Sequence, residues 1–153
     1  MADHSMRQPA DVDGGPILLV DDDPDDVELT LRALRRGRVL NPVIRTWDPD
    51  TALRVLRGEE GTNPRRPAIS LVLLDLHLPG VGGWGLLAAL QDDPQLRGVP
   101  VVVVSGSCSE AERIQCEQHG ALAFLEKPLD VSKLLGVIGD LAEAGLYLVR
   151  LAA

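Results

Sequence analysis

The sequence predicts an α/β fold, a doubly wound parallel sheet of five strands in the order 2-1-3-4-5. The first observation is alternation: five short apolar runs and five amphipathic segments of helical spacing follow one another along the 153 residues. The second is that the first, third and fourth runs are nearly continuous in apolar residues and do not alternate, which is typical of parallel strands covered on both faces. Because crossovers between parallel strands are right-handed, few strand orders remain, and this one has its switch point between the first and third strands.

The five predicted strands are short and rich in Val, Ile and Leu, the residues that favour a pleated, buried backbone. In chain order they are PILLV (16–20), PVIRT (42–46), ISLVLL (69–74), PVVVV (100–104) and ALAFL (121–125).

The five predicted helices each have an apolar face that repeats every three or four residues. In chain order, the helices and the side chains of their apolar faces are 25–36 (Val27, Leu31, Leu34), 48–57 (Ala52, Leu53, Val55, Leu56), 83–91 (Trp84, Leu86, Leu87, Leu90), 109–119 (Ala111, Ile114, Cys116) and 130–142 (Val131, Leu134, Leu135, Ile138, Leu141). Trp47 and Trp84 stand near helix starts, and we expect both to be packing residues.

Composition and charge argue against several classes of protein. A formal net charge of −8 disfavours a nucleic-acid binder, because such affinity comes mostly from Lys and Arg on phosphates. No apolar run approaches the roughly 20 residues that span a bilayer, and the N-terminus lacks the pattern of a signal peptide. Cys108 and Cys116 suit neither a disulfide framework nor a metal site. We therefore expect a cytoplasmic protein with reduced cysteines and no membrane role.

The chain divides into three parts. Residues 1–15 are polar, contain Gly and Pro and have no periodicity, so we expect a flexible leader. Residues 16–143 hold all the predicted strands and helices and form one domain. Residues 144–153 add apolar side chains after that domain is complete. This C-terminal extension either supports a dimer or folds back over the domain's own core.

Five carboxylates stand in six residues directly after the first strand, at positions 21, 22, 23, 25 and 26. Crowded, partly buried carboxylates repel one another, and each is harder to keep ionised. One explanation is a solvated turn that opens a helix, since Asp is favoured at N-caps and in first turns. The other explanation is a site that binds a cation.

Chemically reactive side chains follow several strands of the predicted sheet. Asp21 and Asp22 follow the first strand, Asp75 the third and Ser105 the fourth, and Lys127 comes shortly after the fifth. Ligand sites in such sheets lie outside the carboxyl ends of the strands. Taken singly, each side chain could be only a cap or a surface charge. Together they suit phosphoryl transfer to a carboxylate nucleophile beside Mg²⁺, an ion that prefers oxygen ligands.

The segments ILLVDDDPDD, LVLLDLHLPGVGG, VVVVSGS and FLEKP resemble, in order and spacing, the receiver domain of two-component response regulators. The resemblance runs from about Pro16 to Leu141. It implies a receiver fold that accepts a phosphoryl group from a histidine kinase and is not an enzyme in its own right. It also implies that phosphorylation repacks the face made by the fourth helix, fifth strand and fifth helix. In the members of this family that are paired with phytochrome-type kinases, a C-terminal extension supports a homodimer through the same face.

The resemblance assigns roles to individual residues. It implies that Asp75 is the phosphoacceptor and that Asp21 and Asp22 hold Mg²⁺, together with Asp75 and the backbone carbonyl of His77. Lys127 corresponds to the family lysine.

Two further positions correspond to the family's switch. Ser105 is where the family has its switch hydroxyl, and Phe124 is where it has its switch aromatic. The bond between Lys127 and Pro128 falls where the family has a cis peptide, although the sequence alone would suggest trans.

The apolar extension and the long loop at 58–67 resemble those of stand-alone regulators paired with phytochrome-type histidine kinases. Two other classes are weaker alternatives. A Mg²⁺-dependent aspartyl-phosphate phosphatase would need a second acid two residues after Asp75, where His77 stands. A flavin-binding flavodoxin-like module would need aromatic stacking partners and a phosphate-binding loop.

Overall fold

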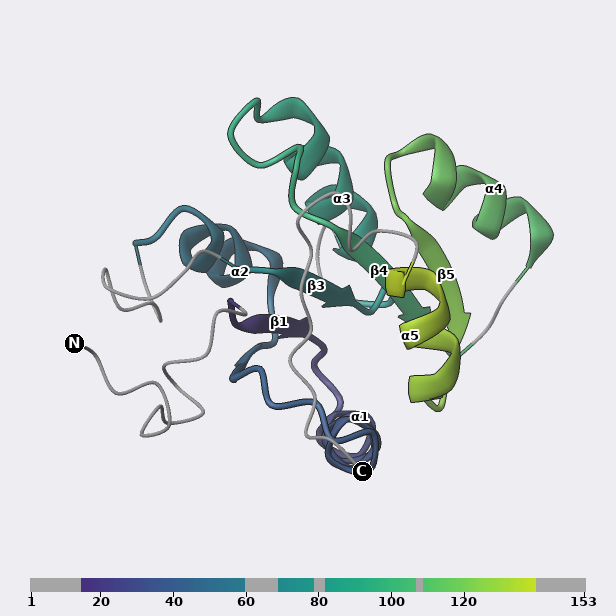
Figure 1. Ribbon diagram of the computed structural model, residues 1–153. Coiled ribbons are helices and arrows are strands. Elements are labelled where there is room, and N and C mark those ends of the chain that lie inside the picture. The colour runs from purple at the N-terminus through teal and green to yellow at the C-terminus, as the bar shows by residue number, and fades with distance from the viewer. Residues whose placement is uncertain (1–14, 60–68, 79–81, 107–108, 140–153) are drawn as a thin grey trace.

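A computed structural model describes residues 15–59, 69–78, 82–106 and 109–139. Five parallel strands form one sheet in the order β2-β1-β3-β4-β5, with helices on both faces (Figure 1). The strands are β1 (Ile17–Val20), β2 (Val43–Thr46), β3 (Leu71–Leu74), β4 (Val101–Ser105) and β5 (Ala123–Glu126). The helices are α1 (Pro24–Arg36), α2 (Pro49–Leu56), α3 (Gly82–Asp92), α4 (Glu110–Gln118) and α5 (Val131–Gly139). The predicted fold class and strand order are confirmed.

Register places the carboxyl ends of the central strands side by side. Val20, at the end of β1, pairs with Thr46 on one side and with Leu74 on the other. The amide of Asp75 then donates to the carbonyl of Val20 at 3.0 Å, so the chain that leaves β3 stays attached to β1. Every residue of β1, β3 and β4 is buried, as their continuous apolar runs predicted.

The strands bury side chains on two faces because successive residues of a strand point in opposite directions. Leu18 and Val20 of β1 belong to the core that also contains buried side chains of α2, α3 and α4. Ile17 and Leu19 belong to the core beneath α1 and α5. The sheet is therefore the middle layer of a three-layer domain.

The acidic run opens α1. Asp23 is the N-cap, and its side chain accepts hydrogen bonds from the amides of Asp25 and Asp26. Pro24 follows at the first helical position, where its missing N–H is not needed. Part of the acidic run is thus explained by helix capping, as the simpler of our two interpretations held.

Two expectations about packing are wrong. Trp47 is 60% exposed, and Arg45 lies over its ring at 6.0 Å, so this tryptophan is not a core residue. Ile114 of α4 is 47% exposed and Ala111 is exposed too, which leaves Cys116 as the buried member of the predicted face. The reason is that α4 lies beside the edge strand β5 and covers only a narrow part of the sheet (Figure 1). Cys108 lies outside the described residues.

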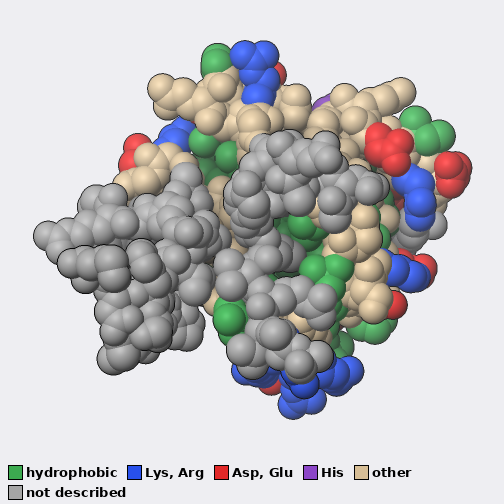
Figure 2. All heavy atoms as spheres, in the orientation of Figure 1, with side chains coloured by type: hydrophobic (Ala, Val, Ile, Leu, Met, Phe, Trp, Pro, Cys, Tyr) green, Lys and Arg blue, Asp and Glu red, His purple; other side chains and the backbone are tan. Residues whose placement is uncertain are grey.

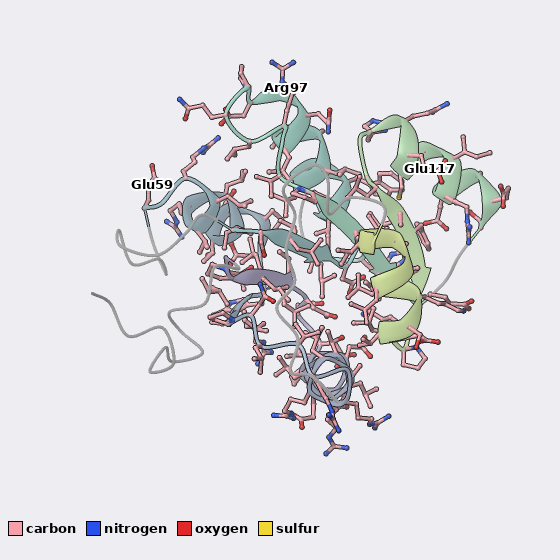
Figure 3. The ribbon with its side chains drawn as sticks, viewed as in Figure 1. Glu59, Arg97 and Glu117 are labelled. Atoms are coloured by element: carbon pink, nitrogen blue, oxygen red, sulfur yellow. The ribbon has the colours of Figure 1, made fainter. Side chains whose placement is uncertain are left out.

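Apart from those of the site described below, many charged side chains lie on the outside of the domain. Glu59, Arg97 and Glu117, labelled in Figure 3, are exposed and point away from the sheet. In Figure 2, Lys and Arg side chains gather at the bottom of the view, over α1, whose last turn carries Arg35 and Arg36. No helix among the described residues has both the length and the apolar character needed to cross a bilayer.

Candidate functional site

Three carboxylates meet at the carboxyl edge of the sheet. Asp21 and Asp22 follow β1, and Asp75 follows the neighbouring β3. One ligand oxygen from each lies within 4.8 Å of the other two. Asp21 and Asp75 are only 2% and 6% exposed, whereas Asp22 is open to solvent. We call this group the acidic triad.

Backbone amides orient the two buried carboxylates. The amide of Asp23 donates to Asp21 Oδ1 at 3.0 Å, and the amide of His77 donates to Asp75 Oδ1, also at 3.0 Å. In each case the donor lies two residues after the aspartate, so the bond closes a local turn that needs no contact from another part of the chain. The second oxygen of each carboxylate, Oδ2, does not take part in these bonds and accepts from Lys127 instead.

Lys127 provides the positive charge of the site. It follows β5, and its amide donates to the carbonyl of Ser105 at 2.8 Å, which ties this position to the end of β4. Its Nζ donates to Asp21 Oδ2 at 3.1 Å, Asp75 Oδ2 at 3.2 Å and Asp26 Oδ2 at 2.6 Å. The lysine side chain is 13% exposed. All three donors of the ammonium group are thus used by carboxylates.

The charges of the site shift two pKa values. Burial raises the pKa of Asp21, because it removes water from the carboxylate and outweighs the hydrogen bonds from Asp23 and Lys127. Burial alone would lower the pKa of Lys127, but hydrogen bonds to Asp26 and Asp21 and the charges of Asp21 and Asp75 together raise it above its usual range. Lys127 is therefore charged at neutral pH, while burial makes the ionised form of Asp21 less favourable than it would be in water.

Ser105 is fully buried at the end of β4, and its Oγ has no hydrogen-bond partner among the described residues. Thr46 Oγ1, at the end of β2, is also buried without a hydrogen-bond partner among the described residues. A buried hydroxyl without a partner is uncommon and unfavourable, and it calls for an explanation. Phe124 is 4% exposed, pairs with Val103 across the sheet and packs in the core on the side of α2, α3 and α4.

The structure therefore brings together most of the predicted site. The acidic triad and Lys127 form one cluster, and Ser105 ends the adjacent strand. The bond between Lys127 and Pro128 is cis, as the resemblance implied. The carbonyl of His77 as a ligand stays a prediction. The side chain of His77 is exposed.

One residue of the cluster was missed. Asp26 contacts Lys127, although its place in the acidic run gave it no distinguishing mark. Its position three residues after the N-cap Asp23 puts it on the first turn of α1. That spacing was available from the sequence, but the direction of this turn relative to Lys127 was not.

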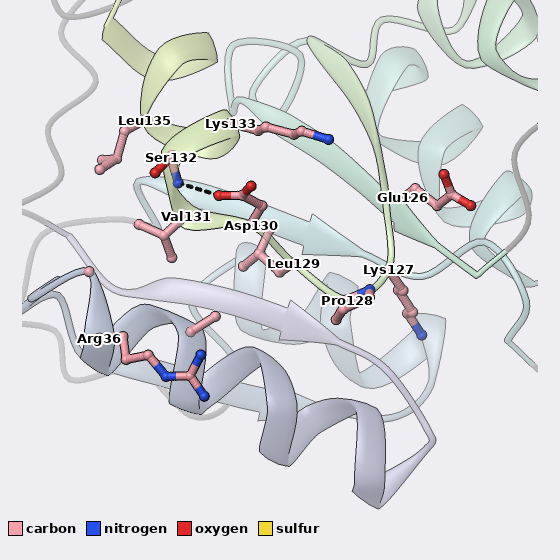
Figure 4. Close-up of a pocket in the computed structure, with 12 residues that line it drawn as sticks. Arg36, Glu126, Lys127, Pro128, Leu129, Asp130, Val131, Ser132, Lys133 and Leu135 are labelled. Carbon is pink, nitrogen blue, oxygen red and sulfur yellow. Dashed lines mark hydrogen bonds between the residues drawn. The ribbon is translucent and has the colours of Figure 1, made fainter.

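A separate cavity of about 630 Å³ lies between the end of α1 and the start of α5 (Figure 4). Lys127, Arg36 and Lys133 contribute to its wall. In Figure 4 the side chain of Lys127 extends from the connection between β5 and α5 toward the loop between β1 and α1. The acidic triad does not line the cavity, so this cavity is distinct from the acidic site, which lies at the ammonium end of Lys127.

The residues present suit a divalent cation. The triad offers only oxygen donors, two of them buried, and crowds three negative charges together. Mg²⁺ takes oxygen ligands in an octahedral arrangement and usually retains several waters, which an exposed Asp22 would permit. When bound there, such an ion would supply charge neutralisation for phosphate oxygens.

Fold and site together define a flavodoxin-like α/β domain with an acidic pocket at the carboxyl ends of its strands. The chain belongs to the response regulator receiver domain family, whose sequence pattern matches residues 17–139. Receiver domains are phosphoacceptor signalling modules that work with histidine kinases, and they are not enzymes in the usual sense. This membership favours the receiver over the phosphatase and the flavin binder.

Three similar proteins illustrate the relationship. The bacteriophytochrome response regulator AtBRR is 32% identical, with a TM-score of 0.75, and the match covers 93% of this chain and 100% of that one. The Mn²⁺-bound structure of response regulator Rcp1, a protein of Synechocystis, is 29% identical with a TM-score of 0.65, covering 90% and 99%. The probable methanogenesis regulatory protein FilR2 of Methanothrix harundinacea is 32% identical, covering 83% and 81%.

Proposed function

We propose that Asp75 accepts a phosphoryl group from a phosphohistidine of a histidine kinase, in a reaction that requires Mg²⁺. The observation that carries the proposal is the environment of Asp75: a buried carboxylate with a lysine ammonium 3.2 Å from one oxygen and two further acids within 4.8 Å. Asp21, Asp22 and Asp75 would hold the ion, together with the backbone carbonyl of His77. The Mn²⁺-bound form of the related Rcp1 supports a divalent ion in this family.

In the proposed transfer, a carboxylate oxygen of Asp75 attacks the phosphorus of the phosphohistidine. The new O–P bond forms as the N–P bond breaks, and the histidine nitrogen keeps the electron pair and takes up a proton. Lys127 would then donate to a phosphoryl oxygen as a compact positive charge. The backbone N–H of His77 keeps the other carboxylate oxygen in place, which leaves Oδ2 as the atom nearest to Lys127.

The signal would pass through Ser105 and Phe124. A phosphoryl group adds roughly −1.5 to −2 charge and three strong acceptors, and the buried, unpartnered Oγ of Ser105 is a donor suited to one of them. Movement of Ser105 would allow Phe124 to repack, which alters the face made by α4, β5 and α5. Two states that differ by a few kcal/mol are enough for such a switch.

We further propose that the partner is a bacteriophytochrome-type histidine kinase and that the chain acts as a stand-alone, dimeric regulator. The similarity to AtBRR, a bacteriophytochrome response regulator matched over its whole length, supports this. The C-terminal extension, 144–153, lies outside the described residues, so its role in a dimer stays a prediction. Sedimentation of the full chain and of a version ending at residue 144 would test it, since equal monomeric behaviour contradicts the dimer.

The central experiment is labelling with acetyl phosphate and Mg²⁺, followed by identification of the modified residue. We expect one acid-stable but base- and hydroxylamine-labile phosphoryl group on Asp75, and no labelling of Asp75→Asn or of wild type in EDTA. Asp50→Asn, which removes an exposed carboxylate from the first turn of α2, serves as the control. Labelling of Asp75→Asn at the wild-type level would place the acceptor elsewhere. Transfer from purified bilin-bearing kinases, compared with other kinases, would test the partner.

A further inference from the structure

Asp26 makes the shortest of the three contacts of Lys127. The distance from Nζ to Asp26 Oδ2 is 2.6 Å, compared with 3.1 Å for Asp21 and 3.2 Å for Asp75. Over the ranges that the structure describes, Lys127 is the only side chain that donates a hydrogen bond to the Asp26 carboxylate or forms an ion pair with it. This carboxylate is 32% exposed, so it lies at the rim of the site while the other two lie inside it.

The carboxylates of Asp21 and Asp75 would have to bind both the ammonium group of Lys127 and a divalent cation. Asp21 and Asp75 each use Oδ1 for a backbone amide and Oδ2 for Lys127, and both belong to the acidic triad. With a divalent cation on the triad, the ammonium group would share these oxygens with a dication and would be repelled by it at close range. Asp26 is outside the triad, so its contact with Lys127 does not compete with a metal.

An acid in the first turn of a helix also has a simpler explanation. Carboxylates there are stabilised by the partial positive charge of the helix N-terminus, and Asp25 and Asp26 both occupy that turn of α1. Asp25, however, is exposed and makes no ion pair in the described part of the chain. The helix dipole therefore accounts for the presence of two acids but not for the contact that only Asp26 makes.

We propose that Asp26 is a positioning residue for the phosphoryl-transfer reaction. Its carboxylate retains the ammonium of Lys127 within reach of Asp75 when a divalent cation occupies the acidic triad. The inference rests on the proposed function of Asp75 and deepens it, because it names the group that keeps the family lysine in place. A flexible four-carbon side chain needs such a partner once its other two contacts are shared.

The first test measures the position of Lys127 without any phosphoryl transfer. The sequence contains two lysines, Lys127 and the exposed Lys133, so Lys133 is an internal reference. An amine-reactive acetylating reagent is applied in saturating Mg²⁺, and both sites are quantified by mass spectrometry. We expect Lys127 to be protected in wild type and in Asp25→Asn, and to react at least about threefold faster in Asp26→Asn. Equal protection in Asp26→Asn and wild type would overturn the proposal.

The second test measures the initial rate of labelling by acetyl phosphate at saturating Mg²⁺. Asp26→Asn should be slower by about threefold to tenfold, the loss expected for a partly exposed hydrogen bond to a charged group. Asp26→Glu should recover most of the rate, and Asp25→Asn should stay within about twofold of wild type. In a Lys127→Met background, Asp26→Asn should have no further effect. A rate for Asp26→Asn that equals or exceeds wild type would show that Asp26 does not position Lys127 for transfer.

The two hypotheses fail in different ways. If the proposed function is wrong, wild type is not labelled on Asp75 at all. If only the role of Asp26 is wrong, wild type is labelled on Asp75 and the Asp26 and Asp25 variants behave alike. Urea unfolding of each variant, followed by circular dichroism, shows that the compared proteins are folded under the assay conditions.

Discussion

Replacement of Lys127 by Met removes the only cation that contacts Asp21 and Asp75 among the described residues. The carboxylates of these two residues are 3% and 7% exposed, so they cannot be solvated in its place. Removing one partner of a buried ion pair typically destabilises a protein by about 3–5 kcal/mol, because the remaining charge is left uncompensated. Asp26 adds little to this figure, since a third of its side chain is already in water.

The loss of folding free energy in Lys127→Met has an upper limit, because a carboxylate left without its cation can take up a proton and become neutral. A carboxyl group of ordinary pKa, about 3.9, can be protonated at about 1.4 kcal/mol per pH unit, or about 4 kcal/mol at pH 7 and about 1.5 kcal/mol at pH 5. We therefore expect Lys127→Met to lower the free energy of unfolding by about 3 kcal/mol at pH 7.5 and by about 1 kcal/mol at pH 5.

The sign of this pH dependence follows from the carboxylates. Because the pKa of Lys127 is raised, its stabilising contribution is complete below its ordinary pKa of 10.5 and disappears only at higher pH, outside the range tested. The pKa of Asp21 is raised by burial, so the folded state binds its proton more tightly and stability falls as pH rises through that pKa. Lys127 lowers the pKa of Asp21, so in Lys127→Met the fall of stability with rising pH should continue to higher pH than in wild type.

The assay is urea unfolding of wild type, Lys127→Met and Lys133→Met, in EDTA and in millimolar Mg²⁺, at both pH values. Lys133 is exposed and has no ion pair among the residues described, so its replacement should change stability by less than about 0.5 kcal/mol. Mg²⁺ should restore most of the stability of Lys127→Met, since it binds the folded triad. A loss below about 1 kcal/mol in EDTA at pH 7.5, or an equal loss at pH 5, would refute the reasoning.

Two further predictions concern local structure. A Cβ at Gly83 would lie 2.5 Å from the carbonyl oxygen of Asp75 and 2.6 Å from the Cα of Leu76. Gly83→Ala should therefore destabilise the protein by about 1–3 kcal/mol and reduce labelling of Asp75. Gly98→Ala is the control for both urea unfolding and labelling, because nothing lies within 4 Å of a Cβ at that position. Unimpaired labelling of Gly83→Ala would contradict the contact. Asp48 caps α2 through a 2.8 Å bond from the amide of Thr51, so Asp48→Ala should cost about 1 kcal/mol at pH 7 in urea unfolding. That bond lowers the pKa of Asp48, so its contribution is present above the ordinary pKa of 3.8 and is lost as pH falls below it, and the difference between the two proteins should shrink at pH 3.

The elements of the fold could be predicted because their signals are local. Continuous apolar runs such as Leu71–Leu74 indicated strands buried on both faces, and these strands are indeed fully buried. The acids and Ser105 were placed at strand ends by counting residues along such runs, and strand order then brought them together. The exposure of Ile114 could not be predicted in this way, because it depends on how much of the sheet α4 covers. The exposure of Trp47 could not be predicted either, because this residue lies in the connection between β2 and α2 and has no periodic pattern around it.

The sequence by itself determined the strand order and the membership of the acidic triad, since apolar periodicity and the parallel sheet leave little freedom at the strand ends. Only the tertiary structure decided which carboxylate of the acidic run contacts Lys127. Asp26 and Lys127 are 101 residues apart, and their contact depends on how α1 packs beside the connection from β5 to α5. Such a contact is set by the relative position of two elements, and no pattern within either element records it.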